Sequence, residues 1–186
     1  MGKKIYRIVS WTFLILTLIS IVLMLRKPSA PPVVSSAEAA KSFDEKIGQV
    51  EQPSPQSAPQ EVHITEAELN SKLQESMQGA GTTPGPAALE AASIHLEGDR
   101  MIGTFTVKVS GKDLYLTLGG KLGAVNGQVQ FTPTEVKLGS LPVPVSAVES
   151  TLRQKLDSPE MRDHMKLPDS IKDIRIENGE LVLVPK

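Results

Sequence analysis

The sequence predicts an α+β fold: an N-terminal transmembrane helix, then a curved antiparallel sheet packed with two amphipathic helices. Three observations predict it. The first apolar run, Ile8–Leu25, carries no charge. Between residues 93 and 132, apolar and polar residues alternate with a period of two, which indicates strands with one buried and one wet face. Near residues 65–78 and 145–156, apolar residues instead recur every three or four positions, as in amphipathic helices.

The run Ile8–Leu25 is expected to cross a membrane once, as an uncleaved signal anchor. Its 18 residues would span about 27 Å as a helix, close to the thickness of a bilayer's hydrocarbon core. Three basic residues precede the run and two follow it, which favours a cytoplasmic N-terminus and an extracytoplasmic remainder. A cleaved signal peptide is the alternative, but its apolar region usually has only about 7–15 residues.

The chain divides into three predicted parts. Residues 1–27 form a cytoplasmic stub with the anchor, residues 28–60 a flexible tether, and residues 61–186 an extracytoplasmic α+β domain. The tether is rich in Pro, Ser, Ala and Gln, a composition typical of extended linkers. The stretch AEAAKSFDEKIGQ within it has the composition of a short helix, but a plain spacer is the favoured interpretation.

The domain opens with a helix predicted at about 65–78. Thr65 is a good N-cap, and Glu68 lies three residues later, where its carboxylate can bond back to the Thr65 amide and complete a capping box. Gly79 is the expected residue just beyond the C-terminal end of the helix.

The strand block follows this helix. Gly119 and Gly120 are expected to bend or bulge one strand, and Asn126-Gly127 is a strong signal for a two-residue hairpin turn. Pro133 should end the strand after that turn. The predicted strands lie at 93–97, 101–109, 114–118 and 128–132, with a continuation past a bulge at 135–138.

The remainder predicts an extended segment, a helix and a hairpin. Proline restricts both itself and its predecessor, so Leu141–Pro144 should be extended. The second amphipathic helix is predicted at 145–156. Residues 171–177 and 180–184 should pair around a turn at Asn178-Gly179.

Composition and motifs exclude several classes of function. The 15 basic and 21 acidic residues after Lys27 give a net charge of −6, whereas nucleic-acid binding needs a basic surface. The chain contains no cysteine, and His63, His95 and His164 lack metal-ligand spacing. Nucleophile elbows and phosphate-binding loops are missing as well. The sequence predicts a protein that is not an enzyme, with no catalytic residue, metal or cofactor.

Several segments resemble a known family. ITEAELNSKL opening a helix, the alternating strands, VNGQVQFTPTEVKLGSLPVPVSAVESTL and the final hairpin together resemble the YpmS-like and LmeA-like membrane-anchored envelope proteins. These are related to tubular lipid-binding (TULIP-like) domains. The resemblance covers about residues 62–186, and Leu138–Pro144 is its most telling stretch. It implies a strongly curved sheet that wraps a helix and leaves an apolar groove for an acyl chain.

Twelve apolar side chains are the predicted lining of this groove. They are Leu69, Leu73, Met77, Phe105, Val107, Leu114, Leu116, Leu118, Val129, Phe131, Val148 and Leu152. The same residues would also serve as the solid core of a small domain, so both interpretations stay open. A phospholipid or another apolar ligand is the expected partner, besides the membrane itself. The alternative function is a scaffold subunit that binds a protein partner in a cell-envelope complex.

Overall fold

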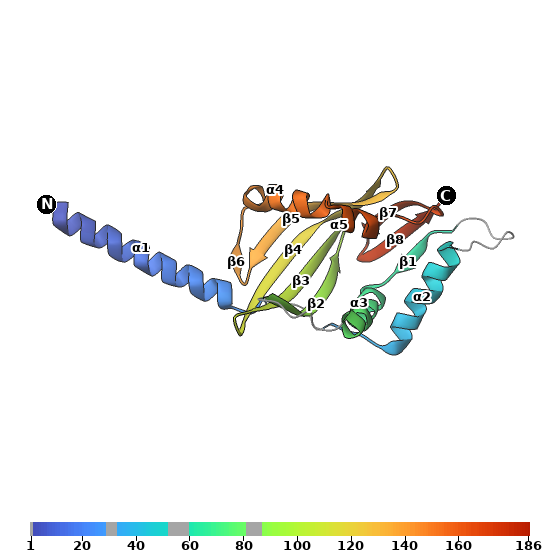
Figure 1. The fold of residues 1–186 in the computed structure, drawn as a ribbon, viewed down its shortest axis with the longest axis horizontal. Helices are drawn as coiled ribbons and strands as arrows, with labels where there is room; N and C mark the ends of the chain where they lie inside the picture. Colours follow the sequence, from blue (N-terminus) through green and yellow to red (C-terminus); the bar gives the residue numbers. More distant parts are fainter. Residues whose placement is uncertain (1, 29–32, 52–59, 81–86) are drawn as a thin grey trace.

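The computed structural model describes residues 2–28, 33–51, 60–80 and 87–186. The fold is α+β, with two antiparallel sheets and helices packed around them (Figure 1). In chain order the elements are α1 (Gly2–Leu25), α2 (Ala37–Glu51), β1 (Val62–Ile64), α3 (Glu66–Ala80), β2 (Ala87–Glu97), β3 (Arg100–Val109), β4 (Lys112–Val125), β5 (Gln128–Leu138), β6 (Leu141–Pro142), α4 (Val145–Leu156), α5 (Pro159–His164), β7 (Ile171–Glu177) and β8 (Glu180–Pro185).

The larger sheet has five strands in the order β2-β3-β4-β5-β6, each antiparallel to its neighbour. The predicted hairpin turn is confirmed, because Asn126 and Gly127 both have positive φ, 54° and 74°. The predicted irregularity near Gly119 and Gly120 is also confirmed, because the β4–β5 register shifts between them. Bulges of this kind bend a strand and increase its twist.

Pro133 does not end its strand, but the predicted continuation past a bulge at 135–138 is confirmed. Strand β5 runs through Pro133 to Leu138. Pro133 pairs with Gly120 and Glu135 with Gly119, so Thr134 is the extra residue of the bulge. A bulge is one of the few positions in a sheet where a residue without an N–H is tolerated.

A second, three-stranded sheet has the order β1-β8-β7. Its β7–β8 hairpin turns at Asn178-Gly179, as predicted, with φ values of 53° and 79°. The third strand, β1, was not predicted. It pairs with β8 through partners such as Val62 and Leu183. The described residues therefore form two sheets rather than one.

Two predicted helices are confirmed, with one correction. Helix α4 covers the predicted residues 145–156. At the start of α3, the Thr65 N–H donates to Glu68 Oε2 at 2.7 Å and the Glu68 N–H donates to Thr65 Oγ1 at 3.3 Å, which completes the capping box. Gly79, however, does not end the helix, because α3 continues through it to Ala80.

Helix α2 corrects the expectation of a plain spacer at residues 37–51. It packs beside α3 (Figure 1). Its Val50 is only 3% exposed, and Phe43 and Ile47 pack against the same core. This part of the predicted tether is therefore an integral helix of the fold. The PSAPP and QPSPQSAPQ stretches fall largely on residues 29–32 and 52–59, outside the described residues.

The buried core lies where the three-stranded sheet, α2 and one end of the large sheet meet. Its members come mainly from β7 and β8. They are Val50, Ile64, Leu96, Leu167, Ile171, Ile174, Ile176, Leu181 and Leu183. None of the twelve predicted groove residues belongs to this buried set, although Leu69 and Val129 pack against it. The core therefore leaves much of the large sheet uncovered.

Helix α1 ends against the β5–β6 turn. The Ser140 N–H donates to the Leu23 carbonyl oxygen at 2.8 Å. Gly139 has a φ of 61°, and a Cβ added to it would lie 2.3 Å from the Met24 carbonyl oxygen. The sheet and the end of α1 are thus in direct contact. Within the described part of the chain, no helix combines the length and apolarity that a membrane crossing requires.

A candidate ligand groove

The twelve predicted groove residues are all partly buried, and none is fully buried. The structure separates them into two groups. Leu69, Leu73 and Met77 lie on α3, which packs against α2 and the edge strand β2. The other nine lie on β3, β4, β5 and α4. Only this second group belongs to the large sheet and the helix above it.

The strand register gathers apolar side chains on one face of the large sheet. Phe105 pairs with Leu116, and Leu116 pairs with Leu138 on the next strand. Val107 pairs with Leu114 in the neighbouring row. Directly paired residues in an antiparallel sheet point to the same face. The face is therefore apolar across three strands, and the five side chains named here are only partly buried.

Two phenylalanine rings lie over two glycines on this face. A Cβ added to Gly103 would lie 3.1 Å from the Phe105 ring, and one added to Gly120 would lie 2.6 Å from the Phe131 ring. Any larger residue would push the rings away from the backbone. The two glycines thus let both phenylalanine rings lie close against the backbone of the sheet.

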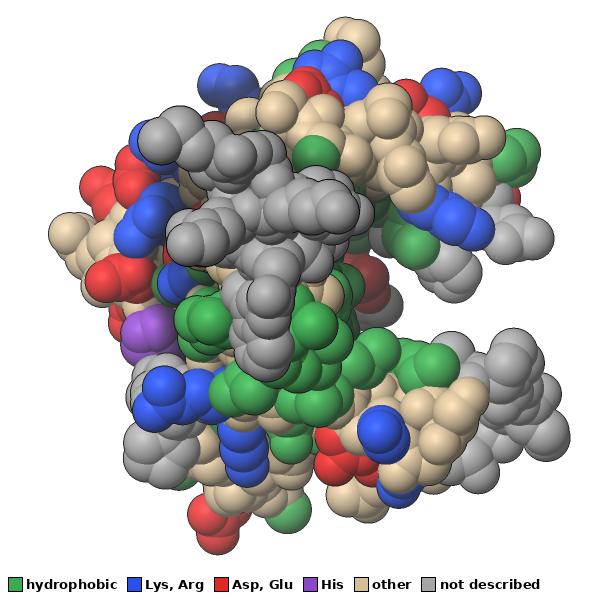
Figure 2. All heavy atoms as spheres, turned by 90° about the vertical axis from the view of Figure 1, so that its left-hand side faces the viewer, with side chains coloured by type: hydrophobic (Ala, Val, Ile, Leu, Met, Phe, Trp, Pro, Cys, Tyr) green, Lys and Arg blue, Asp and Glu red, His purple; other side chains and the backbone are tan. Residues whose placement is uncertain are grey.

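Helix α4 lies along β5 without sealing this face. Its apolar stripe consists of Val145, Val148, Leu152 and Leu156, all only partly buried, and the helix has no fully buried residue. In Figure 2, which looks from the α1 side, the molecule is hollowed beneath its upper part, where Figure 1 shows α4. Helix α4 therefore lies beside β5 without closing the space between them.

A cavity of about 460 Å³ lies between β5, α4 and α5. Its apolar lining comes from both sides and includes three predicted residues, Val129, Phe131 and Leu152. The sequence analysis missed the other apolar members, which are Val125, Pro133, Val145, Leu156 and Met165. Val145 and Leu156 could have been found, because they share the predicted stripe of α4 with Leu152.

The rim of the cavity is charged. Arg153 Nη2 lies 2.7 Å from Glu149 Oε1, one helical turn away on α4. Arg162 on α5 lies 3.9 Å from Asp157. All four of these side chains line the cavity beside its apolar residues. The cavity therefore has a mixed lining of apolar, polar and charged side chains, which suits an amphiphile whose tail leaves water while its polar end stays solvated.

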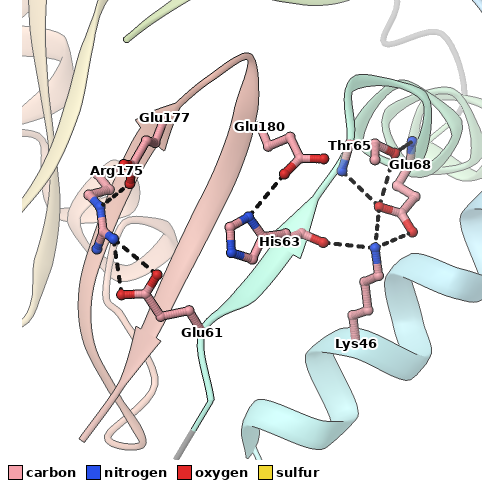
Figure 3. A network of polar contacts seen from close by, with 8 residues as sticks. All are labelled: Lys46, Glu61, His63, Thr65, Glu68, Arg175, Glu177 and Glu180. Carbon is pink, nitrogen blue, oxygen red and sulfur yellow. Dashed lines mark hydrogen bonds and ion pairs between the residues drawn. The ribbon is translucent and has the colours of Figure 1, made fainter. Parts of the chain in front are cut away.

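A polar network at the opposite end of the molecule fastens α2, β1 and α3 together (Figure 3). Glu68 is 5% exposed. Burial alone would raise its pKa, but hydrogen bonds from Lys46, Ser42 and Thr65 outweigh burial and lower the pKa from 4.5 to about 2. Lys46 also donates to the His63 carbonyl oxygen at 2.7 Å. The network ties α2 to the domain.

The remaining polar groups of Figure 3 form ion pairs and hydrogen bonds between the segments of the small sheet. Arg175 bonds both carboxylate oxygens of Glu61, at 3.0 and 3.1 Å, and Glu177 at 3.0 Å. His63 Nδ1 lies 2.9 Å from Glu180 Oε2. Among the described residues, no group of three or more potential metal-ligating side chains comes together. These contacts connect β1, β7 and β8, together with Glu61, to one another.

Of the three histidines, two have described side chains, and these lie on different elements: His63 on β1 and His95 on β2. His95 is partly buried, and its Nδ1 lies 2.7 Å from Glu66 Oε2 on α3. The side chain of His164 lies outside the described part of the structure. The described imidazoles therefore act as hydrogen-bonding partners of carboxylates.

Comparison with known proteins gives no relative. No protein-family model matches the chain, and neither a curated protein nor a solved structure is detectably similar to it.

Proposed function

We propose that this protein is a non-enzymatic, membrane-anchored extracytoplasmic domain that binds a lipid or another apolar ligand between the large sheet and α4. One observation carries the proposal: apolar side chains of β5, such as Phe131, and of α4, such as Leu152, line a shared cavity, and α4 has no fully buried residue. Each CH₂ group of a ligand placed there would gain about 0.8 kcal/mol by leaving water. An acyl chain would complete the interface that α4 leaves open.

The location of the core favours the interpretation of a ligand groove and argues against a solid core at the same residues. A small domain must bury apolar residues somewhere, and this one does so around β7 and β8. The predicted groove residues on the sheet and α4 lie outside this buried core, although Leu96 of β2 belongs to it and Val129 packs against it. Exposed apolar surface that is continuous and rimmed by polar groups is typical of binding sites.

The anchor is part of the same proposal. The uncharged run Ile8–Leu25 has the length of a lipid bilayer, and apolar side chains of α1 such as Leu16 and Val22 are 64% exposed. With the N-terminus in the cytoplasm, the sheet domain would lie on the extracytoplasmic side of the membrane. The contact between Ser140 and Leu23 would then hold the domain close to the lipid surface. The resemblance to the YpmS-like and LmeA-like proteins points the same way.

Lipid retention by the full chain tests the proposal. The protein, purified in detergent and incubated with phospholipid, should keep one bound lipid in native mass spectrometry. Leu152→Glu adds a charge to the cavity wall and should reduce the bound fraction about tenfold or more, because a carboxylate would have to lose its water. Gln154→Glu, on the exposed side of the same helix, is the matched control and should leave retention unchanged.

Three results would overturn the proposal. The first is a protein that never retains lipid. The second is equal retention by the Leu152→Glu and Gln154→Glu variants. The third is a stoichiometric protein partner, recovered by cross-linking in membranes, whose contacts occupy α4 and β5. This third result would favour the scaffold alternative, in which a partner protein covers the apolar face.

A further inference from the structure

Strand β5 has an open stretch on its outer edge, the edge away from β4. Near the start of the strand, the Val129 N–H donates to the Met165 carbonyl oxygen at 2.8 Å. At the other end, beside the pairing with β6, the Val143 N–H donates to the Val136 carbonyl oxygen at 2.9 Å. Between residues 130 and 135, no described segment pairs with this edge.

The two paired ends fix the direction of the backbone groups between them. Successive N–H groups of a strand point to opposite edges, and that of Val129 points away from β4, toward Met165. The N–H and C=O of Phe131, two residues further along, therefore also point away from β4. Among the described residues, neither of these two groups has a hydrogen-bond partner. Phe131 thus presents one free donor and one free acceptor at the edge of the sheet.

The cavity of about 460 Å³ lies along this open edge. Six consecutive residues of β5, from Gln128 to Pro133, line it. A cavity on one face of a sheet would meet only alternate residues of a strand, so contact with six in a row places the cavity beside β5. Its other wall consists of α4 and α5, the helices that connect the two paired ends of the edge (Figure 1). The free backbone groups of Phe131 therefore point toward the cavity.

The charged side chains of the cavity are already paired with one another. Arg153 and Glu149 lie 2.7 Å apart, and Arg162 lies 3.9 Å from Asp157. These four are the charged residues of the lining, and their formal charges sum to zero. The cavity therefore presents no net charge to an ionic headgroup. The N–H and C=O of Phe131, held in position by the strand, are a fixed neutral recognition element.

We propose that the ligand of this cavity is a lipid with an N-acyl amino acid unit, in which an amide joins the acyl chain to an amino acid residue. This inference rests on the proposed function and names its class of lipid. The N–H of the acyl amide donates to the Phe131 carbonyl oxygen, and the carbonyl of the amino acid accepts from the Phe131 N–H. Two antiparallel strands pair in the same way. The acyl chain lies against apolar side chains such as Val129 and Leu152.

Two matched ligands test this assignment with the full chain in detergent micelles. One is N-octanoylglycine N-methylamide, and the other is its ester analogue, in which an oxygen atom replaces the N–H of the octanoyl amide. Both are neutral and keep the acyl chain and the second carbonyl. The amide should bind about tenfold more tightly than the ester, because only the amide can donate to the Phe131 carbonyl oxygen.

Amide hydrogen exchange locates the bond. In the free chain the Phe131 N–H should exchange rapidly, whereas the Val129 N–H, bonded to Met165, should be protected. The octanoyl amide should slow exchange at Phe131 by about tenfold or more and leave Val129 unchanged. N-acetylglycine N-methylamide is the control ligand. It should bind at least about a hundredfold more weakly, because it lacks the CH₂ groups that leave water.

The possible outcomes separate this assignment from the proposed function. Equal affinities for the octanoyl amide and its ester would overturn the assignment and leave lipid binding untouched, as would a Phe131 N–H that is already protected in the free chain. An acetyl control that binds as tightly as the octanoyl amide would assign the strand edge to a peptide and overturn the lipid ligand. A chain that binds neither phospholipid nor the octanoyl amide would overturn both proposals.

Discussion

Asn70 on α3 and Ile94 on β2 exchange two hydrogen bonds. The Ile94 N–H donates to Asn70 Oδ1 at 2.8 Å, and Asn70 Nδ2 donates to the Ile94 carbonyl oxygen at 2.7 Å. Strand β2 lies at the edge of the large sheet, where backbone groups lack a neighbouring strand. The amide of Asn70, which is 1% exposed, takes the place of that strand.

Replacing Asn70 by leucine should destabilise the fold by about 2–4 kcal/mol. The change nearly conserves volume but leaves the N–H and C=O of Ile94 buried without partners. Urea unfolding followed by circular dichroism measures the loss. Gln78→Leu, on the exposed side of the same helix, should change stability by less than about 0.5 kcal/mol. Equal effects of the two variants would contradict a specific role for Asn70.

Glu68 should make the fold sensitive to acid. Its folded-state pKa of about 2 lies below the ordinary 4.5, so its contribution is complete above pH 4.5 and is lost as the pH falls toward 2. The difference corresponds to about 3 kcal/mol. Glu68→Gln should destabilise the protein at pH 7 and flatten the pH dependence of its stability between pH 5 and 2.

Glu45→Gln is the control for that experiment. Glu45 is on the same helix as Lys46, its side chain is 63% exposed, and among the described residues its ion pair is with Lys41, at 3.8 Å. Pairs of this kind contribute little in water. Its acid profile should match that of the parent chain, and a Glu68→Gln profile as steep as the parent's would refute the prediction.

Gly120→Ala should be strongly destabilising, whereas Gly123→Ala should not. A Cβ on Gly120 would lie 2.4 Å from the Thr132 carbonyl oxygen and 2.6 Å from the Phe131 ring, but one on Gly123 meets nothing within 4 Å. Both glycines lie on β4. We expect Gly120→Ala to lower the unfolding free energy by about 2–4 kcal/mol and to displace the ring from the sheet. Comparable urea midpoints for the two variants would argue against this packing.

Gly139→Ala should loosen α1 from the sheet. Its Cβ would meet the Leu23 and Met24 carbonyl oxygens at 2.4 and 2.3 Å, so the Ser140 N–H should lose its bond to Leu23. Hydrogen exchange of the Ser140 amide should then speed up by about tenfold or more. Gly98→Ala carries the same backbone strain, at the same φ of 61°, without any neighbour within 4 Å, and should leave the Ser140 amide protected.

Local chemistry explains what the sequence could predict. The turns at Asn126-Gly127 and Asn178-Gly179 need positive φ, which these residues supply at low cost, so both hairpins were predictable. The capping box of Thr65 and Glu68 likewise depends only on residues three apart. The apolar stripe of α4 gave the bounds of that helix.

Long-range contacts explain what the sequence could not predict. Strand β1 is three residues long and exists because β8 pairs with it. The sequence of helix α2 is largely polar, and the helix contributes only Val50 to the fully buried core. Hydrogen bonds from Lys46 and Ser42 to Glu68 hold it against α3. Pairing across strands is not encoded in any one segment.

The pairing of β1 with β8 sets an order of events during synthesis. The hairpins β2–β3, β3–β4, β4–β5 and β7–β8 join neighbours in the chain, and such local contacts form early. Val62 must wait until Leu183 has left the ribosome before the two can pair. A translating chain can therefore build the large sheet first, while the hydrophobic centre around β8 assembles only after β8 itself has been synthesised.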